Sequence, residues 1–260
     1  MMRTHQLPVL SNRQVSDRYW HMKVDASSVE EQIEPGQFFH IRCADKLYPF
    51  LRRPFSIYRI GEGYIEFLYL VKGLGTEEMT RHKAGDTLDV MGPVGVGFTL
   101  PDTSRSILLV GRGVGIATLA ALAQVAVNRD VACTAILSAR SSNDLLAADF
   151  LTQMGANVIK VTDDDGSSEV GRVKTVMERL IEEDAVDAVY TCGSRRLSRL
   201  GQEAVEEYGL FGEIALEENM GCAMGACFAC VSDIKDDNNN IQSVRVCLEG
   251  PVFPLEKVVL

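Results

Sequence analysis

The sequence predicts a β-barrel plus α/β fold, in which an antiparallel barrel precedes a parallel-sheet domain and a small carboxy-terminal subdomain. The first hundred residues form short alternating apolar and polar runs, after Pro101 apolar strands alternate with helices, and beyond Glu217 glycine, alanine and cysteine predominate. A chain of 260 residues with 46% hydrophobic content has room for such an arrangement. We expect domains at 1–101, 102–216 and 217–260.

The barrel strands are expected where apolar residues alternate with polar ones between glycine, proline and charged turns. A short helical stretch is expected at 77–82, directly after two glycines and a threonine. The predicted strands are 37–41, 55–58, 65–71 and 87–91.

The second domain is expected to be a parallel sheet with helices on both faces, because continuous apolar strands alternate with helical segments. The predicted strands are 106–110, 131–137, 157–161 and 188–191, and the predicted helices are 117–128, 143–154 and 173–183. Residues 243–247 are expected to form one further strand in the last subdomain.

The charge of the chain excludes some classes of partner. The formal net charge is -10, so there is no basic field to bind nucleic acid or anionic lipid. We find no apolar run long enough for a signal peptide or a membrane span, and we expect a cytoplasmic protein. In that reducing compartment disulfides are rare, so grouped cysteines indicate metal or redox chemistry. Cys43 and Cys133 lie in predicted strands and are expected to be buried core thiols.

The other grouped cysteines have the spacing C-x4-C-x2-C-x16-C, which is the ligand order of a plant-type [2Fe-2S] cluster. Small residues between them leave room for a loop that curls around an inorganic core and points its amides at the sulfurs. A four-cysteine zinc site is the alternative, but such sites normally use two closely spaced pairs. Coincidental buried thiols are a further alternative. The predicted cluster ligands are Cys222, Cys227, Cys230 and Cys247.

Two segments of the predicted barrel have residues suited to a dinucleotide. Arg53, followed by Pro54 and Ser56, can set a guanidinium against a diphosphate and a hydroxyl against a heterocycle, although an exposed basic pair before a strand is the alternative. Gly73, Gly75 and Thr76 precede a helical stretch, whose first amides form an anion site. The turn 92–98 is expected to be a plain turn.

The chain resembles the electron-transfer subunit of class B dihydroorotate dehydrogenase, within the ferredoxin-reductase-like superfamily. The resemblance rests on four segments that follow one another along the chain: RRPFSI, VKGLGTEEM, MGPVGVGF and the cysteine tail. The resemblance covers nearly the whole chain. It implies a flavin-binding barrel with FAD held by Arg53, Pro54, Ser56, Gly75 and Thr76. It also implies a nucleotide-binding α/β domain, NAD(H) as co-substrate, and docking to a separate flavin-containing catalytic subunit in a hetero-oligomer.

The nucleotide-binding turn departs from the pattern of that family. Gly111, Gly113 and Gly115 follow a strand and open a helix, which is the context of a phosphate-binding turn. Arg112 stands where the family usually has a third glycine. Its guanidinium either pairs with a nucleotide phosphate or blocks the close backbone approach that a glycine permits.

A second segment of this domain resembles the family's CGP segment but has Ser194 in place of proline. Cys192 is therefore either a contact on the nicotinamide side, and so the candidate catalytic residue, or a core thiol at a strand end. The acidic turn at 163–167 either binds ligand at the carboxyl end of a strand or is solvated. Arg140 is equally able to face a 2′-phosphate or solvent, so NAD and NADP both stay open.

These features predict an electron relay among a pyridine nucleotide, FAD, a [2Fe-2S] cluster and an external redox centre. Flavin exchanges electrons singly or in pairs, and so connects a hydride carrier to a one-electron cluster. In the resembled family, dihydroorotate oxidation to orotate in pyrimidine biosynthesis supplies the electrons. The alternatives are a reductase subunit that serves a hydrogenase, a sulfur reductase or an oxygenase, and a non-catalytic module stabilised by zinc.

Overall fold

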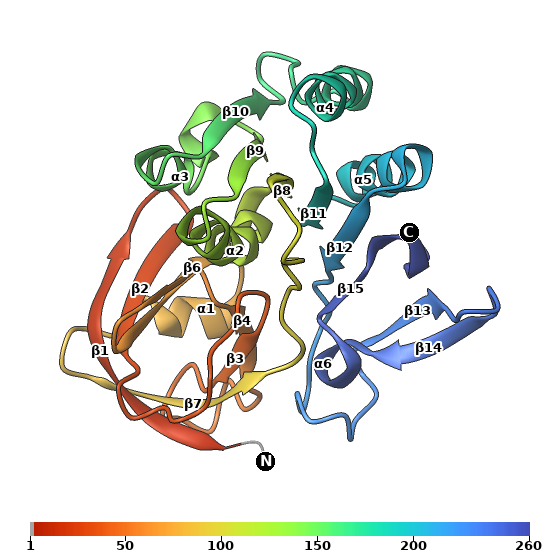
Figure 1. The fold of residues 1–260 in the computed structure, drawn as a ribbon. Coiled ribbons are helices and arrows are strands. Elements are labelled where there is room, and N and C mark those ends of the chain that lie inside the picture. The colour runs from red at the N-terminus through yellow and green to blue at the C-terminus, as the bar shows by residue number, and fades with distance from the viewer. Residues whose placement is uncertain (1–2) are drawn as a thin grey trace.

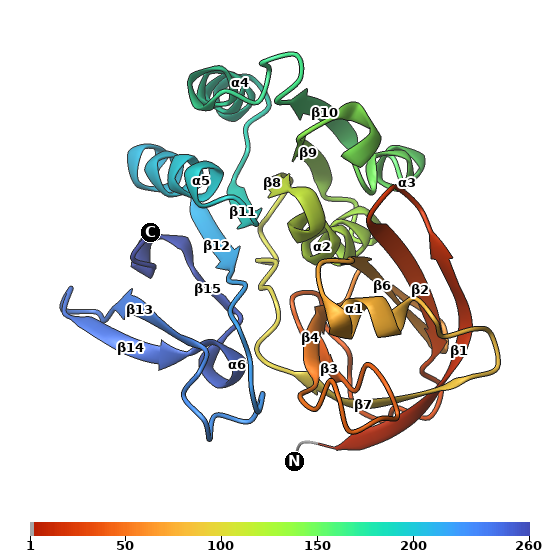
Figure 2. The same cartoon turned by 180° about the vertical axis from the view of Figure 1, so that it is seen from behind.

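The computed structural model describes residues 3–260 and contains two main sheets that lie side by side (Figures 1 and 2). The first is a seven-stranded antiparallel sheet with the order β4-β3-β7-β1-β2-β6-β5. Its outer strands β4 and β5 are not hydrogen-bonded neighbours in the described chain, so the curled sheet is a half-barrel. Its strands are β1 (Thr4–Gln14), β2 (Tyr19–Asp25), β3 (Phe38–Ile41), β4 (Arg53–Ser56), β5 (Arg59–Gly61), β6 (Tyr64–Leu70) and β7 (Thr87–Val94).

The half-barrel has its own core because alternate side chains of each strand point inward. Leu7, Met22, Phe39 and Phe67 are fully buried there, and helix α1 (Leu74–Met79) contributes the buried side chain of Met79. Burial of such large apolar side chains contributes about 1.5–3 kcal/mol each. The half-barrel therefore holds its loops on a rigid base.

The second sheet has six strands in the order β10-β9-β8-β11-β12-β15. The first five are parallel to their neighbours, and β15 is antiparallel at the edge. The chain turns from β8 toward β9 and later returns on the other side of β8 at β11, so the ligand crevice of such a sheet lies at the ends of β8 and β11. The strands are β8 (Ser106–Arg112), β9 (Ala132–Ala139), β10 (Asn157–Thr162), β11 (Ala188–Cys192), β12 (Phe211–Ala215) and β15 (Val252–Pro254).

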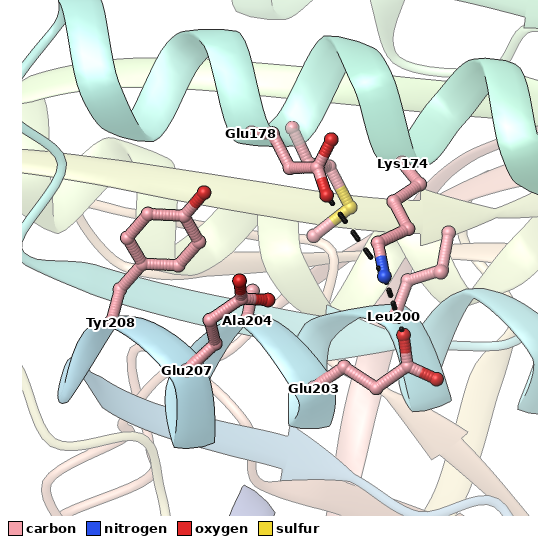
Figure 3. Close-up of a pocket in the computed structure, with 8 residues that line it drawn as sticks. Lys174, Glu178, Leu200, Glu203, Ala204, Glu207 and Tyr208 are labelled. Carbon is pink, nitrogen blue, oxygen red and sulfur yellow. Dashed lines mark hydrogen bonds and ion pairs between the residues drawn. The ribbon is translucent and has the colours of Figure 1, made fainter.

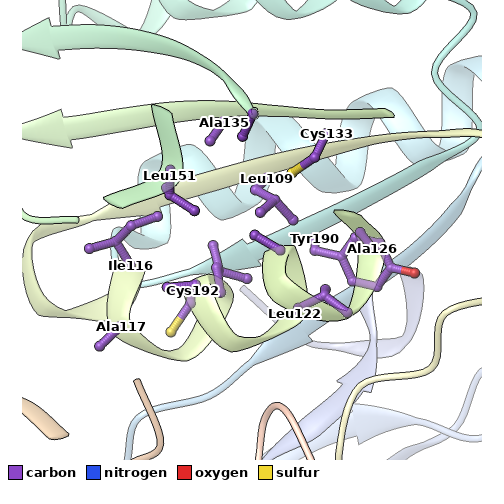
Figure 4. Packing of buried hydrophobic residues seen from close by; sticks show 14 of the residues in the cluster. Leu109, Ile116, Ala117, Leu122, Ala126, Cys133, Ala135, Leu151, Tyr190 and Cys192 are labelled. Atoms are coloured by element: carbon purple, nitrogen blue, oxygen red, sulfur yellow. The ribbon is translucent and has the colours of Figure 1, made fainter. Parts of the chain in front are cut away.

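Helices cover both faces of this sheet, as predicted. On one face lie α2 (Ile116–Asn128) and α3 (Ala148–Gln153), with the 3-10 turns Gly113–Gly115 and Ser142–Asp144 before them. Figure 4 shows the core under α2, where Ile116 and Leu122 pack near Cys133, Tyr190 and Cys192. Both Cys133 and Cys43 are buried, as expected.

The opposite face carries α4 (Val170–Glu183) and α5 (Arg195–Tyr208), which pack against each other. Figure 3 shows their seam, in which Lys174 reaches toward Glu178 and Glu203. The seam holds a cavity of only about 10 Å³, lined also by Tyr208. A space of that size takes one water at most, so the seam is a packing contact.

The last part of the chain forms a small unit beside the parallel sheet. A hairpin of β13 (Val231–Lys235) and β14 (Ile241–Arg245) is followed by the short helix α6 (Val246–Glu249), β15 and the 3-10 turn Leu255–Lys257. Because β15 pairs with β12, this unit is tied to the six-stranded sheet. Among the described residues, no helix has the length and apolar character that crossing a membrane requires.

The structure corrects several predicted elements. The predicted helix 143–154 is only a 3-10 turn and the short α3, because Ala147 takes a left-handed conformation (φ 62°) between them. Helix α1 begins at Leu74, so Gly75 and Thr76 lie in its first turn and not before it. Cys247 lies in α6 and not in a strand. Strands β1, β2, β5, β12, β13 and β15 and helix α5 were not predicted.

Candidate functional site

The cysteine segment curls on itself because three of its residues have a left-handed backbone. The φ angles are 53° at Ala223, 76° at Gly225 and 56° at Phe228. The positive φ at Gly225 favours glycine, and a Cβ there would lie 2.9 Å from the end of the Leu248 side chain, which would have to move aside. This curl turns successive amides toward the inside of the loop.

The amides point at the sulfur atoms of the cysteines. The amides of Met224 and Cys227 donate to Cys222 Sγ at 3.4 Å. The amide of Gly225 donates to Cys247 Sγ at 3.3 Å, and that of Cys247 to Cys230 Sγ at 3.4 Å. The structure therefore supplies amide donors to the sulfurs of three predicted ligands, Cys222, Cys230 and Cys247.

The electrostatics of the thiols differ across the group. Burial acts to raise the pKa of Cys222, but the donors from Met224 and Cys227 outweigh it and lower that pKa to about 7. Burial, together with the neighbouring Cys230 thiol, raises the pKa of Cys247 to about 12. Amide donors favour a thiolate, which is the form that binds iron.

The four thiols form two pairs, Cys222 with Cys227 and Cys230 with Cys247. Over residues 3–260, no three His, Cys, Asp or Glu side chains converge as ligands of one metal ion. Two pairs suit a cluster with two irons, whereas a structural zinc site needs four ligands around one ion. The residues present therefore fit a [2Fe-2S] cluster better than zinc.

Arg53 and its neighbour Arg52 have different roles in the structure. Arg52 donates to both carboxylate oxygens of Asp89 on β7, at 2.8 and 2.9 Å, and so holds two strands together. The Arg53 guanidinium donates instead to the backbone carbonyls of Leu51 and Arg52. Its side chain lies beside Gly75, where a Cβ would be 3.4 Å from Arg53 Cγ. The strand β4 and helix α1 thus bring these two predicted residues together.

The start of α1 leaves amides available for a ligand. The Thr76 hydroxyl accepts from the amides of Lys72 and Gly73 at 3.0 and 3.2 Å, and it donates to the carbonyl of Gly73. Within residues 3–260, the amides of Leu74 and Gly75 have no acceptor. Thr76 therefore fixes the turn, and the free amides beside Arg53 suit an anionic group such as a diphosphate.

The nucleotide turn is built by two segments in close contact. A Cβ at Gly115 would lie 2.7 Å from the carbonyl oxygen of Cys192, and one at Gly193 would lie 2.6 Å from that of Arg112. Gly193 also has a φ of 108°, which only glycine adopts easily. The glycines of both segments are thus required for the ends of β8 and β11 to approach each other.

Arg112 reaches along this edge of the sheet. It donates to Ser138 Oγ at the end of β9 (2.7 Å) and to Asp163 just after β10 (2.7 Å). The hydrogen bond from Arg112 is the main cause that lowers the pKa of Asp163, and Ser168 adds to it. Asp165 bonds instead with Ser167 of its own turn, which lowers its pKa to about 2. Within the acidic turn, Asp163 therefore faces the sheet edge that carries Arg112. Asp165 has its hydrogen-bond partner inside the turn.

Cys192 is almost completely buried, with 1% of its surface exposed. Burial raises the pKa of its thiol well above the usual value, so it is a neutral thiol in the folded chain. Its side chain lies in the core beneath α2, while its carbonyl contacts Gly115 (Figure 4). A contact between this thiol and nicotinamide stays a prediction.

Comparisons with known proteins agree with this arrangement. The family model for the iron-sulfur cluster binding domain of dihydroorotate dehydrogenase B matches residues 217–259. The electron-transfer subunit of dihydroorotate dehydrogenase B (NAD(+)) from Desulforamulus reducens is 35% identical over all of this chain and 99% of its own length. That from Bacillus cereus strain B4264 is 32% identical over the full length of both. The chain belongs to the family of these electron-transfer subunits.

Solved structures show the same fold as this family member. The structure of an NADH-dependent reduced ferredoxin-NADP oxidoreductase, described for flavin-based electron bifurcation, matches 98% of this chain and 90% of its own with a TM-score of 0.82 and 27% identity. The ferredoxin-NADP+ reductase of Plasmodium falciparum matches 79% of this chain and 91% of its own with a TM-score of 0.63 at 13% identity. The predicted fold class, an antiparallel barrel followed by a parallel α/β sheet and a small carboxy-terminal subdomain, is confirmed, with the barrel present as a half-barrel.

Some residues of the site in this family member were not found from the sequence. A cavity of about 300 Å³ beside Gly193 is lined by Arg195 and Ser198 of α5, by Glu217, and by the last residues of the chain. No sequence pattern indicated this cavity, because α5 was not predicted. His40 stands in no recognisable sequence motif, yet it is buried next to the backbone of Arg52 and Met220.

Proposed function

We propose that the chain relays electrons between a partner redox subunit and a pyridine nucleotide, with a [2Fe-2S] cluster and FAD as its carriers. The reaction served is dihydroorotate oxidation to orotate in pyrimidine biosynthesis, which the similarity to electron-transfer subunits of dihydroorotate dehydrogenase B supports. The observation that carries the proposal is the set of four thiols in two pairs, with amides already directed at their sulfurs.

In this proposal Cys222, Cys227, Cys230 and Cys247 hold the cluster. Arg53 and the free amides at the start of α1 hold the diphosphate of FAD, with Pro54, Ser56, Gly73, Gly75 and Thr76 shaping the site. When bound, FAD supplies the exchange between paired and single electrons. The turn with Gly111, Gly113 and Gly115 binds the pyridine nucleotide beside Cys192 and Gly193.

The domains at 1–101, 102–216 and 217–260 follow from the same proposal, with FAD, nucleotide and cluster assigned to them in that order. We also assign the protein to the cytoplasm, because a reducing compartment keeps the cysteines as thiols that are able to hold a cluster.

The catalytic partner is proposed to dock at the cysteine loop. Met224, Phe228 and Leu248 there expose 52%, 62% and 43% of their surfaces. Such apolar side chains beside a redox centre are typical of an interface core, because a partner that covers them also shortens the path for the electron. Met220, in contrast, is buried, and so it supports the loop from inside.

A second candidate, a subunit that serves another oxidoreductase, has specific support. Arg112 and Ser194 depart from the family pattern, and the structural neighbour with the TM-score of 0.82 is a ferredoxin-NADP oxidoreductase. The two candidates share the cofactors and differ in the partner.

The test is to purify the untagged chain anaerobically with its native partner. We expect flavin absorbance with iron-sulfur shoulders, and NAD(+) reduction by dihydroorotate in the complex. A colourless chain that binds zinc would overturn the relay. A coloured complex that does not oxidise dihydroorotate would overturn the pyrimidine assignment and favour the second candidate.

A further inference from the structure

Arg245 connects the two parts of the chain that carry the predicted cluster ligands. It lies at the end of β14, two residues before Cys247. One end of its guanidinium donates to the carbonyl of Gly225 in the three-cysteine loop at 3.1 Å. Its other nitrogens donate to Glu249 at the end of α6, at 3.1 and 2.5 Å. The side chain thus bridges the loop and the helix that carries the fourth cysteine.

Glu249 completes this bridge on the side of the helix. One of its carboxylate oxygens also accepts the backbone amide of Arg245, at 2.9 Å, at the start of α6. The helix has only four residues, so few of its own hydrogen bonds hold it. Glu249 therefore fixes the turn that directs the Cys247 amide at Cys230 Sγ.

The charges of this pair lie close to the sulfurs. Gly225 accepts from Arg245 with its carbonyl, and its amide donates to Cys247 Sγ at 3.3 Å. The Arg245 guanidinium also lies 5.1 Å from the centre of the Phe228 ring, and the side chain is 28% exposed. A partly covered charge acts over a short distance with less screening than one in open solvent.

We propose that Arg245 and Glu249 are a positioning pair that holds the three-cysteine loop against helix α6, which carries Cys247, and that sets the reduction potential of the cluster. The proposal rests on the proposed function, because it assumes a [2Fe-2S] cluster on the four cysteines. The potential of such a cluster depends on net charge and on hydrogen bonds to its sulfurs.

We expect the midpoint reduction potential of the cluster to shift in opposite directions when Arg245 or Glu249 loses its charge. Reduction adds one electron, and so one negative charge, to the cluster. Loss of the Arg245 charge leaves Glu249 uncompensated and disfavours that electron, so the midpoint potential falls. Loss of the Glu249 charge leaves the guanidinium uncompensated, so the potential rises. A role that is only structural gives no reason for opposite signs.

The experiment is a potentiometric titration of the full-length protein, followed by electron paramagnetic resonance of the reduced cluster. The variants are R245Q, R245K and E249Q. The control is K257Q, which removes one positive charge from a pair with Asp237 at the far end of the β13-β14 hairpin. Five residues of strand place that end about 16 Å away along the hairpin.

We expect R245Q to lie below and E249Q above the wild-type potential. The gap between them should be about 59 mV, the one-electron equivalent of a tenfold change in the reduction equilibrium. R245K and K257Q should stay near the wild type. Shifts of the same sign in R245Q and E249Q, or an equal shift in K257Q, would overturn the proposal.

If R245Q fails to retain iron, E249Q decides alone: a higher potential supports the proposal, and an unchanged or lower one overturns it. Iron analysis of the wild type separates this inference from the function. A wild type without iron and sulfide refutes the proposed function itself. A wild type that holds the cluster, with no opposite shifts in the variants, refutes only the role of the pair.

Discussion

The cysteine segment and the nucleotide edge are prepared for their ligands in different ways. In the cysteine segment, left-handed residues such as Gly225 turn backbone amides toward the thiols, and the four thiols already form two pairs. At the nucleotide edge, the glycine turn is formed, but side chains of the protein itself, Arg112 and Asp163, bond to each other along it. The cysteine segment thus presents free thiols to a cluster. At the nucleotide edge, Arg112 and Asp163 must give up their bond to each other before either binds a nucleotide.

The difference shows how the two kinds of ligand constrain a chain. A cluster is bound through its sulfur ligands, so the loop and helix α6 together must fix four atoms, and the backbone does this with short-range geometry. A nucleotide is bound through many weaker contacts, so its edge tolerates a substitution such as Arg112 that changes the contacts without changing the turn. The predictions below test this contrast.

The largest effect is expected for Cys227→Ser, because a missing thiolate leaves one iron with an incomplete ligand set. We expect complete loss of iron, of acid-labile sulfide and of electron transfer to one-electron acceptors, with FAD content unchanged. The matched control is Cys133→Ala, which removes a buried thiol of β9 and should keep the cluster. Normal electron transfer to the partner in Cys227→Ser would show that the ligand assignment is wrong.

Gly193→Ala tests whether the nucleotide edge depends on close backbone contact. The φ of 108° and the Arg112 carbonyl at 2.6 Å from a Cβ leave no room for a side chain, so we expect a loss of about 3 kcal/mol in the free energy of unfolding. Urea unfolding measures it. The control is Gly171→Ala on α4, where a Cβ meets open space and the change should stay within about 1 kcal/mol.

His40 of the half-barrel lies against the backbone of Met220, just before the cysteine loop, so a change at His40 probes this contact. Burial, followed by the charge of Arg52, lowers the pKa of His40 from 6.5 to about 4, and neither ring nitrogen has a partner within residues 3–260. The folded state thus keeps the ring neutral. Its contribution to stability is complete above pH 6.5 and decreases as the pH falls toward 4.

We expect the free energy of unfolding to fall by about 2 kcal/mol between pH 7.5 and 5 on account of this residue. In His40→Leu that part of the pH dependence should disappear, as measured by urea unfolding at each pH. An unchanged slope in the variant would contradict a buried neutral ring.

Arg112→Ala should have the smallest effect. The Arg112 and Asp163 side chains are 24% and 43% exposed, so stability should change by less than about 1 kcal/mol. If the guanidinium contacts a nucleotide phosphate, NADH should bind about tenfold more weakly by fluorescence titration. Tighter binding would show instead that Arg112 blocks the backbone. Arg172→Ala, an exposed arginine on α4, should leave affinity unchanged.

The sequence by itself determined the features that depend on short-range spacing. The separation of Cys222, Cys227 and Cys230 is a property of one loop, and the alternation of strands with helices after Pro101 follows from local hydrophobic pattern. Strand β1 escaped prediction because only Leu7 and Val9 of its eleven residues are buried, so its alternation is too short to stand out.

Only the tertiary structure decided which of several similar residues face a site. Arg52 and Arg53 are neighbours in sequence, but Asp89 of a distant strand binds the first and leaves the second beside Gly75. Arg112 meets Asp163, and Arg245 meets Gly225, across 51 and 20 residues. Such pairs depend on the packing of whole sheets and loops, and no local pattern encodes them, because side-chain direction is fixed only when the elements that carry the residues have come together.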